Sequence, residues 1–72
     1  MREIEITHEP TELYKILKFE NLVASGGEAK YVINEGLVLV NGEVETRKRK
    51  QMVSGDTVEF QGEKFLLKLI NS

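Results

Sequence analysis

Apolar residues recur along the first half of the chain with two different periods. Residues 2–6 alternate between polar and apolar side chains (REIEI), which is typical of a short strand with one buried face. Within residues 10–19, leucine and isoleucine recur at helical spacing. Pro10 suits the first turn of a helix because its missing N–H would have no intrahelical partner there. We therefore predict a strand over residues 2–6 and a helix from about residue 10 to residue 19.

A second helix is predicted from about Ser25 onward. Ser25 and Glu28 form the S-x-x-E pattern of an N-terminal capping box. Gly36 lies where a residue in the left-handed region ends a helix. The apolar stripe between these signals consists of Ala29, Val32 and Ile33. Because only a short link separates the two predicted helices, we expect them to form a helical hairpin.

The remainder of the chain has the pattern of short antiparallel strands. Asn41-Gly42 is a strong hairpin signal because both residues of such a turn adopt a positive φ. Strands are expected on both sides of this turn and of later glycine turns, at residues 37–40, 43–46, 57–60 and 64–70. The order of elements predicts an α+β fold, in which a two-helix hairpin packs on a small antiparallel twisted sheet.

Length and composition limit the possible functions. The 72 residues, 40% of them hydrophobic and 31% charged, predict one small domain spanning residues 1–72. The absence of cysteine excludes disulfides and cysteine-ligated zinc, and His8 has no second ligand at metal spacing, so we expect no metal and no cofactor. The apolar runs are too short for a membrane span, no signal peptide is visible, and a cytoplasmic location is expected. We expect a non-catalytic binding module because so small a chain has little room to enclose an active site.

One run of basic residues stands out against a formal net charge of −2. It comprises Arg47, Lys48, Arg49 and Lys50. A local patch rather than the average charge decides where a polyanion docks. Adjacent like charges repel one another unless an anion neutralises them, so contact with nucleic-acid phosphates is favoured. A solvated loop is the alternative.

The predicted second helix carries further candidate residues. Its face opposite the apolar stripe has a basic, an aromatic and an amide side chain and no acid (Gly27, Lys30, Tyr31 and Asn34). Gly26 and Gly27 at the start of this helix would allow an RNA backbone to approach closely. An ordinary solvated helix surface is the alternative. The sequence leaves open whether Lys30 and the basic run share one surface.

Several segments, taken in order, resemble a known domain family. They are L-V-A-S at residues 22–25, E-G-x-V-x-V-N-G at residues 35–42 and V-S-G-D-T-V at residues 53–58. Together they resemble the RNA-binding domain typified by ribosomal protein S-four, also called the αL motif, over roughly residues 11–60. The resemblance implies two helices packed on a small twisted sheet. In this chain we expect one strand before that core and one after it, added at the N-terminal and C-terminal ends. The resemblance also implies binding of structured RNA, ribosomal or transfer RNA, by a protein of the short stand-alone bacterial type that associates with the ribosome. We expect the protein to be a monomer.

The resemblance also indicates which residues would contact RNA. Lys18 and Lys30 match basic positions on the two helices of the family, whereas Glu12 replaces a common arginine and Ser25-Gly26 replaces Ser-Arg. RNA binding would therefore depend mainly on Lys30 and the basic run. The full candidate set is Lys18, Gly26, Gly27, Lys30, Arg47, Lys48, Arg49 and Lys50.

Two other functions fit parts of the sequence. A protein-interaction adaptor would use the strand bearing Leu37 and Leu39, or the C-terminal strand Lys64–Ile70 as an open edge for β-augmentation. Such an interface would be much less sensitive to salt than phosphate binding. A ubiquitin-like sulfur carrier would require a C-terminal Gly-Gly, whereas this sequence ends in Ile70-Asn71-Ser72.

Overall fold

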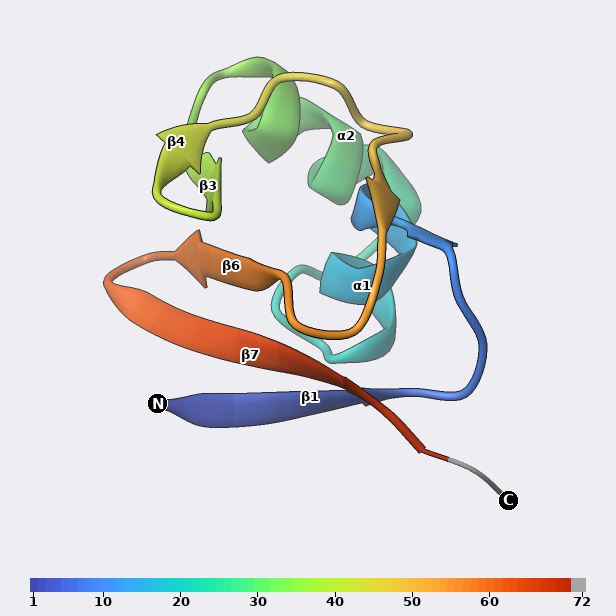
Figure 1. Cartoon of the computed structure of the whole chain (residues 1–72). Helices are drawn as coiled ribbons and strands as arrows, with labels where there is room; N and C mark the ends of the chain where they lie inside the picture. The colour runs from blue at the N-terminus through green and yellow to red at the C-terminus, as the bar shows by residue number, and fades with distance from the viewer. Residues whose placement is uncertain (71–72) are drawn as a thin grey trace.

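The computed structural model describes residues 1–70, so the last two residues of the predicted 1–72 domain lie outside the described part. Two helices lie against one face of a five-stranded sheet, and a small two-stranded sheet lies beside them (Figure 1). The strand order is β1-β7-β6-β3-β4 in the larger sheet and β2-β5 in the smaller one. The elements are β1 (Arg2–Ile6), β2 (Thr11–Glu12), α1 (Leu13–Phe19), α2 (Gly26–Asn34), β3 (Val38–Val40), β4 (Glu43–Val44), β5 (Gln51–Met52), β6 (Thr57–Phe60) and β7 (Glu63–Leu69). No helix among residues 1–70 is both long enough and apolar enough to cross a membrane.

The predicted apolar faces meet in one hydrophobic core. In β3, Val38 and Val40 are buried, whereas Leu37 before the strand is 52% exposed and Leu39 is half-buried. The alternation follows from the period of two that places successive strand side chains on opposite faces. The helices contribute the stripes that the sequence predicts, namely Leu13, Ile16, Leu17, Ala29, Val32 and Ile33. The α+β class and the two-helix arrangement are therefore confirmed.

Helix α2 begins and ends where its local signals predict. The Ser25 hydroxyl accepts a hydrogen bond from the N–H of Glu28 at 3.2 Å, which supplies the N-terminal cap. At the other end Gly36 has a φ of 77°, and the N–H of Leu37 donates to the carbonyl of Val32 at 3.0 Å. This is the Schellman arrangement, which needs a left-handed residue and therefore favours glycine.

Helix α1 begins three residues later than predicted. It starts at Leu13 rather than near Pro10 because the two residues before it form β2, which pairs with β5. The first N–H groups of α1 also have distant partners. Leu13 donates to the carbonyl of Lys50 at 3.0 Å, and Tyr14 donates to the carbonyl of Lys48 at 3.1 Å. A backbone contact between distant segments thus determines where this helix begins.

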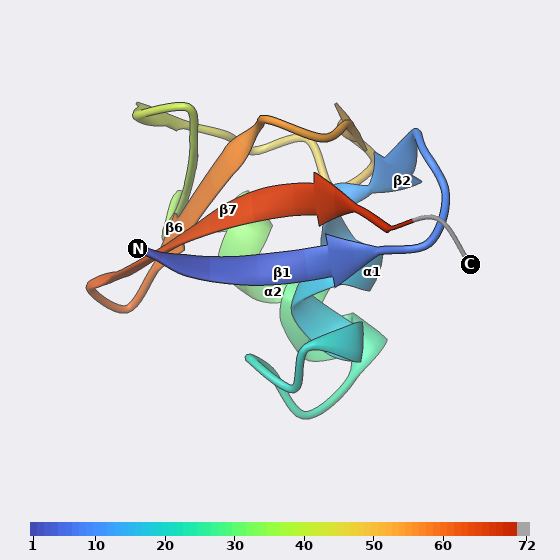
Figure 2. The ribbon, with the colours of Figure 1, turned by 60° about the horizontal axis from the view of Figure 1, so that its bottom comes forward.

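The larger sheet is mixed rather than wholly antiparallel. The strands that follow the helices pair antiparallel, as predicted, but β1 lies parallel to β7, with Ile4 opposite Leu67 (Figure 2). Strand β7 consequently lies between β1 and β6. The expectation that Lys64–Ile70 forms an open edge is therefore wrong, and the edges of the sheet are β1 and β4.

Candidate nucleic-acid interface

A groove lies between α2 and the segment that joins β4 to β5. This segment runs along α2 on its way from β4 to β5 (Figure 1). The groove has a volume of about 590 Å³ and is lined by Gly27, Lys30, Tyr31, Asn34, Thr46, Arg47, Lys48 and Arg49. Four of these residues are cationic and none is acidic. We call this set the basic groove. Its α2 wall is the helix face that the sequence predicts opposite the apolar stripe.

The backbone of the basic run is held against α1. The carbonyls of Lys48 and Lys50 accept the two hydrogen bonds from the start of α1, and the N–H of Lys50 donates to the carbonyl of Arg47 at 3.2 Å. The run is therefore a turn anchored on a helix rather than an extended strand. This anchoring fixes the second wall of the groove relative to the helical hairpin.

The ammonium group of Lys30 has an aromatic neighbour. Its Nζ lies 5.0 Å from the centroid of the Tyr14 ring, within the range of a cation–π interaction. Lys15 approaches the same ring at 6.0 Å. Tyr14 belongs to α1 and is half-buried against the core. The ring thus restricts where Lys30 can place its charge, which favours a position at the groove.

Arg47 forms a bidentate ion pair with Glu45. Its Nε donates to Glu45 Oε2 at 2.9 Å and its Nη2 donates to Oε1 at 3.0 Å. The side-chain hydrogen bonds from Arg47 are the main cause that lowers the pKa of Glu45 from 4.5 to about 2, and the same pair raises the pKa of Arg47. The Glu45 side chain is 12% exposed and the Arg47 side chain 71% exposed. Arg47 is therefore oriented by Glu45, with guanidinium donors left for a ligand.

The other groove cations differ in how far acids compensate them. Arg49 lies 3.8 Å from Glu12, which also pairs with Lys15 at 3.1 Å. Among residues 1–70, no ion pair involves Lys30 or Lys48. These two lysines therefore carry the least compensated positive charge in the groove.

Three residues of the candidate set lie outside the groove lining. Lys18 is exposed on α1 beside Gly26, where an added Cβ on the glycine would lie 3.9 Å from Lys18 Cδ. Lys50 instead lines a separate depression of about 250 Å³ that also contains Glu43 and Glu45. The structure brings together the remaining five, namely Gly27, Lys30, Arg47, Lys48 and Arg49.

Besides the lining residues Tyr31, Asn34 and Thr46, two residues that support the groove from behind its lining were absent from the candidate set. The first is Tyr14, whose contacts with Lys30 and with the Lys48 carbonyl reveal its position behind the groove. The second is Glu45, which has no sequence signal beyond its i, i+2 spacing from Arg47. Tyr31 and Asn34 were placed on the correct helix face, and the helical period is the signal that identifies them as lining residues.

Comparisons with known proteins identify the family. The S4 domain family matches residues 4–68 of the chain. The Escherichia coli protein named "Putative RNA-binding protein YbcJ" is 51% identical over 55 residues, which cover 76% of this chain and 79% of that protein. The Bacillus subtilis protein named "Probable ribosome maturation protein RlbA" is 39% identical over 59 residues, covering 82% and 83% respectively.

A solved structure shares the fold as well. The solution structure of YbcJ from Escherichia coli superimposes with a TM-score of 0.70 at 42% sequence identity, covering 94% of this chain and 87% of that one. It is described as revealing an αL motif involved in RNA binding. The family match, the relatives and the common fold agree with the resemblance found in the sequence, and the chain belongs to the S4 domain family.

Proposed function

We propose that this protein binds structured RNA, ribosomal or transfer RNA, through the basic groove. The observation that carries the proposal is the convergence of Lys30 with Arg47, Lys48 and Arg49 around one groove that has no acidic lining residue. The names of two relatives, one for RNA binding and one for ribosome maturation, support the class of ligand and an association with the ribosome. We also propose that the protein acts as a monomer in the cytoplasm.

Four groove residues have roles that suit their chemistry. Lys30 and Lys48 supply point charges to phosphates, whereas the planar fork of Arg47 suits bidentate contact with a phosphate. Tyr31 is 62% exposed and offers its ring for stacking by an unpaired base. The proposed function is therefore binding rather than catalysis.

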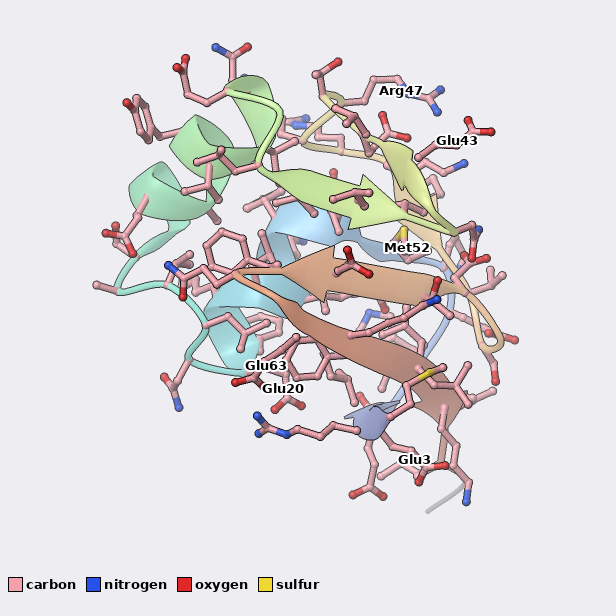
Figure 3. All side chains as sticks on the ribbon, turned by 90° about the vertical axis from the view of Figure 1, so that its left-hand side faces the viewer. Glu3, Glu20, Glu43, Arg47, Met52 and Glu63 are labelled. Carbon is pink, nitrogen blue, oxygen red and sulfur yellow. The ribbon has the colours of Figure 1, made fainter. Side chains whose placement is uncertain are left out.

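The negative net charge does not oppose this function. The two carboxylates that pair with groove cations, Glu45 with Arg47 and Glu12 with Arg49, leave Lys30 and Lys48 without an acidic partner among residues 1–70, and several other acids lie away from the groove. Figure 3 shows Arg47 at one end of the molecule and Glu3, Glu20 and Glu63 at the opposite end. At physiological ionic strength, exposed charges separated by more than about 8 Å are largely screened from one another. A polyanion at the groove therefore interacts mainly with the groove cations.

A pair of matched double variants tests the proposal. Lys30→Gln with Lys48→Gln removes two groove charges, and Lys64→Gln with Lys68→Gln removes two charges from exposed positions of β7. Dissociation constants for fluorescently labelled transfer RNA and a ribosomal RNA fragment would be measured by anisotropy. We expect the groove variant to bind at least about tenfold more weakly, since charged hydrogen bonds contribute about 1.5–3 kcal/mol each. Equal losses in both variants, or no binding by the unmodified protein at low salt, would overturn the proposal.

A further inference from the structure

Strand β1 leaves one side of its backbone open. Among residues 1–70, β1 pairs only with β7. The carbonyl of Ile6 points toward β7 and accepts a hydrogen bond from the N–H of Ile70 at 2.9 Å. Because successive strand residues direct their backbone groups to opposite sides, the N–H and C=O groups of Glu3 and Glu5 point to the open edge. Such an edge is a template for an additional strand.

A hollow with an apolar floor lies beside this edge. It has a volume of about 300 Å³ and lies between β1 and the end of α1. Phe19, at its margin, is 66% exposed, which is unusual for so large an apolar side chain. The lining combines apolar residues with acidic and polar ones, namely Ile4, Ile6, Ile16 and Phe19 with Glu5, Glu20, Thr7, His8 and Thr11.

The charge of the edge identifies the kind of partner. Glu3 and Glu5 alternate along β1, and Glu20 adds a carboxylate at the hollow. The cation of this strand, Arg2, is paired with Glu63. A second copy of the chain would place glutamates opposite glutamates, which is unfavourable between paired strands. Phosphates would be repelled for the same reason, whereas lysine or arginine side chains would be attracted.

We propose that the β1 edge binds an extended basic segment of another protein. The segment would form a strand beside β1, with backbone hydrogen bonds to Glu3 and Glu5 and one apolar side chain in the hollow. Its basic side chains would pair with Glu3 and Glu5, which lie on the face of the sheet opposite Ile4 and Ile6. This function is independent of the basic groove, because Glu3 and Glu20 lie at the end of the molecule opposite Arg47 (Figure 3). One chain could then hold RNA and a basic protein segment at the same time.

A synthetic peptide serves as the probe. A peptide of alternating lysine and valine, seven residues long, would be titrated into the isotopically labelled protein, with a glutamate–valine peptide as its charge-reversed control. We expect saturable chemical-shift changes at residues 2–6 and at Phe19, slower amide exchange at Glu3 and Glu5, and no response to the control peptide. Shifts confined to the basic groove, equal binding of both peptides or no binding at millimolar peptide would each overturn the proposal.

Variants at Glu5 separate the backbone contact from the charge. Glu5→Pro removes the outward N–H without removing a hydrogen bond to β7, and proline is tolerated where an edge strand faces solvent. We expect Glu5→Pro to weaken peptide binding at least about tenfold and Glu5→Gln, which keeps the N–H, to weaken it about twofold to fivefold. Equal affinities of the two variants would contradict strand addition.

A variant at Phe19 provides the second test if Glu5→Pro lowers the melting temperature sharply. Phe19→Ser changes the exposed margin of the hollow, and unchanged peptide affinity in this variant would contradict use of the hollow. RNA affinity should be unchanged in all three variants, which distinguishes this proposal from the proposed function.

Discussion

The ammonium group of Lys30 lies 5.0 Å from the centroid of the Tyr14 ring, so a residue of α1 positions a cation that α2 presents to the groove. The backbone N–H of Tyr14 also donates to the carbonyl of Lys48 at 3.1 Å. Tyr14 therefore contacts both walls of the basic groove, through its ring on one side and its backbone on the other. The groove is thus assembled on α1, although α1 itself contributes no lining residue.

Replacing Tyr14 tests this positioning role. Tyr14→Leu keeps an apolar side chain against the core but removes the ring beneath Lys30. We expect RNA affinity to fall about twofold to fivefold, because an exposed cation–π contact contributes about 0.5–1 kcal/mol. Tyr14→Phe retains the ring and should bind RNA as the unmodified protein does. Anisotropy titrations of both variants check the prediction, and equal affinities of the two would contradict it.

The ion pair between Glu45 and Arg47 should compete with RNA. Glu45→Gln removes the carboxylate that occupies two donors of the Arg47 guanidinium. We expect RNA affinity at low salt to rise by up to about fivefold, since an exposed ion pair contributes at most about 1 kcal/mol. The gain should shrink at high salt, where screening weakens the phosphate contact itself. A lower affinity in this variant would show that orienting Arg47 matters more than freeing its charge.

Acid titration of Glu45 provides a test in the absence of RNA. The pKa of its carboxyl is about 2 in the folded protein and 4.5 when unperturbed. A lowered pKa means that the group stabilises the fold fully above pH 4.5 and that this contribution is lost as the pH falls toward 2. In Arg47→Gln we expect the pKa of Glu45 to rise toward 4.5, measured from the carboxyl carbon shift by NMR. The same titration midpoint in both proteins would contradict the assigned cause.

Two glycine substitutions should have opposite effects on stability. Gly36 has a φ of 77°, and a Cβ added there would lie 3.5 Å from Val44 Cγ1, so Gly36→Ala should lower the free energy of unfolding by about 1–2 kcal/mol. Gly27 lies within α2, where an added Cβ meets only Ser25 Oγ at 3.8 Å. Gly27→Ala should raise that free energy by about 0.5–1 kcal/mol. Urea denaturation measures both values. Destabilisation by Gly27→Ala would contradict the helical geometry described for α2.

The features that local sequence determines were predicted correctly. Ser25, Glu28 and Gly36 mark the ends of α2 through contacts that span only a few residues. The turn at Asn41 and Gly42 adopts positive φ at both positions, 52° and 85°, as that residue pair predicts. The helical period also placed Lys30 on the face that lines the groove.

The features that depend on distant contacts were not predictable in the same way. The parallel pairing of β1 with β7 joins the two ends of the chain, and no local pattern indicates which edge a first strand will join. The late start of α1 depends on the carbonyls of Lys48 and Lys50. The same turn, anchored on α1, directs Lys50 to a separate depression. Lys18 lies on α1 beside Gly26 and therefore does not line the groove.

The salt dependence of RNA binding tests the central claim most directly. Association constants for a ribosomal RNA fragment would be measured from about 50 to 300 mM salt for the unmodified protein and for the two double-lysine variants. With four groove cations on phosphates, we predict a slope of log K against log salt of roughly −3 to −4. The Lys30→Gln, Lys48→Gln variant should lose about 1.5–2 units of that slope, and the Lys64→Gln, Lys68→Gln variant should keep it. An unchanged slope in the groove variant, or binding insensitive to salt, would contradict the assignment of the basic groove as the RNA-binding site.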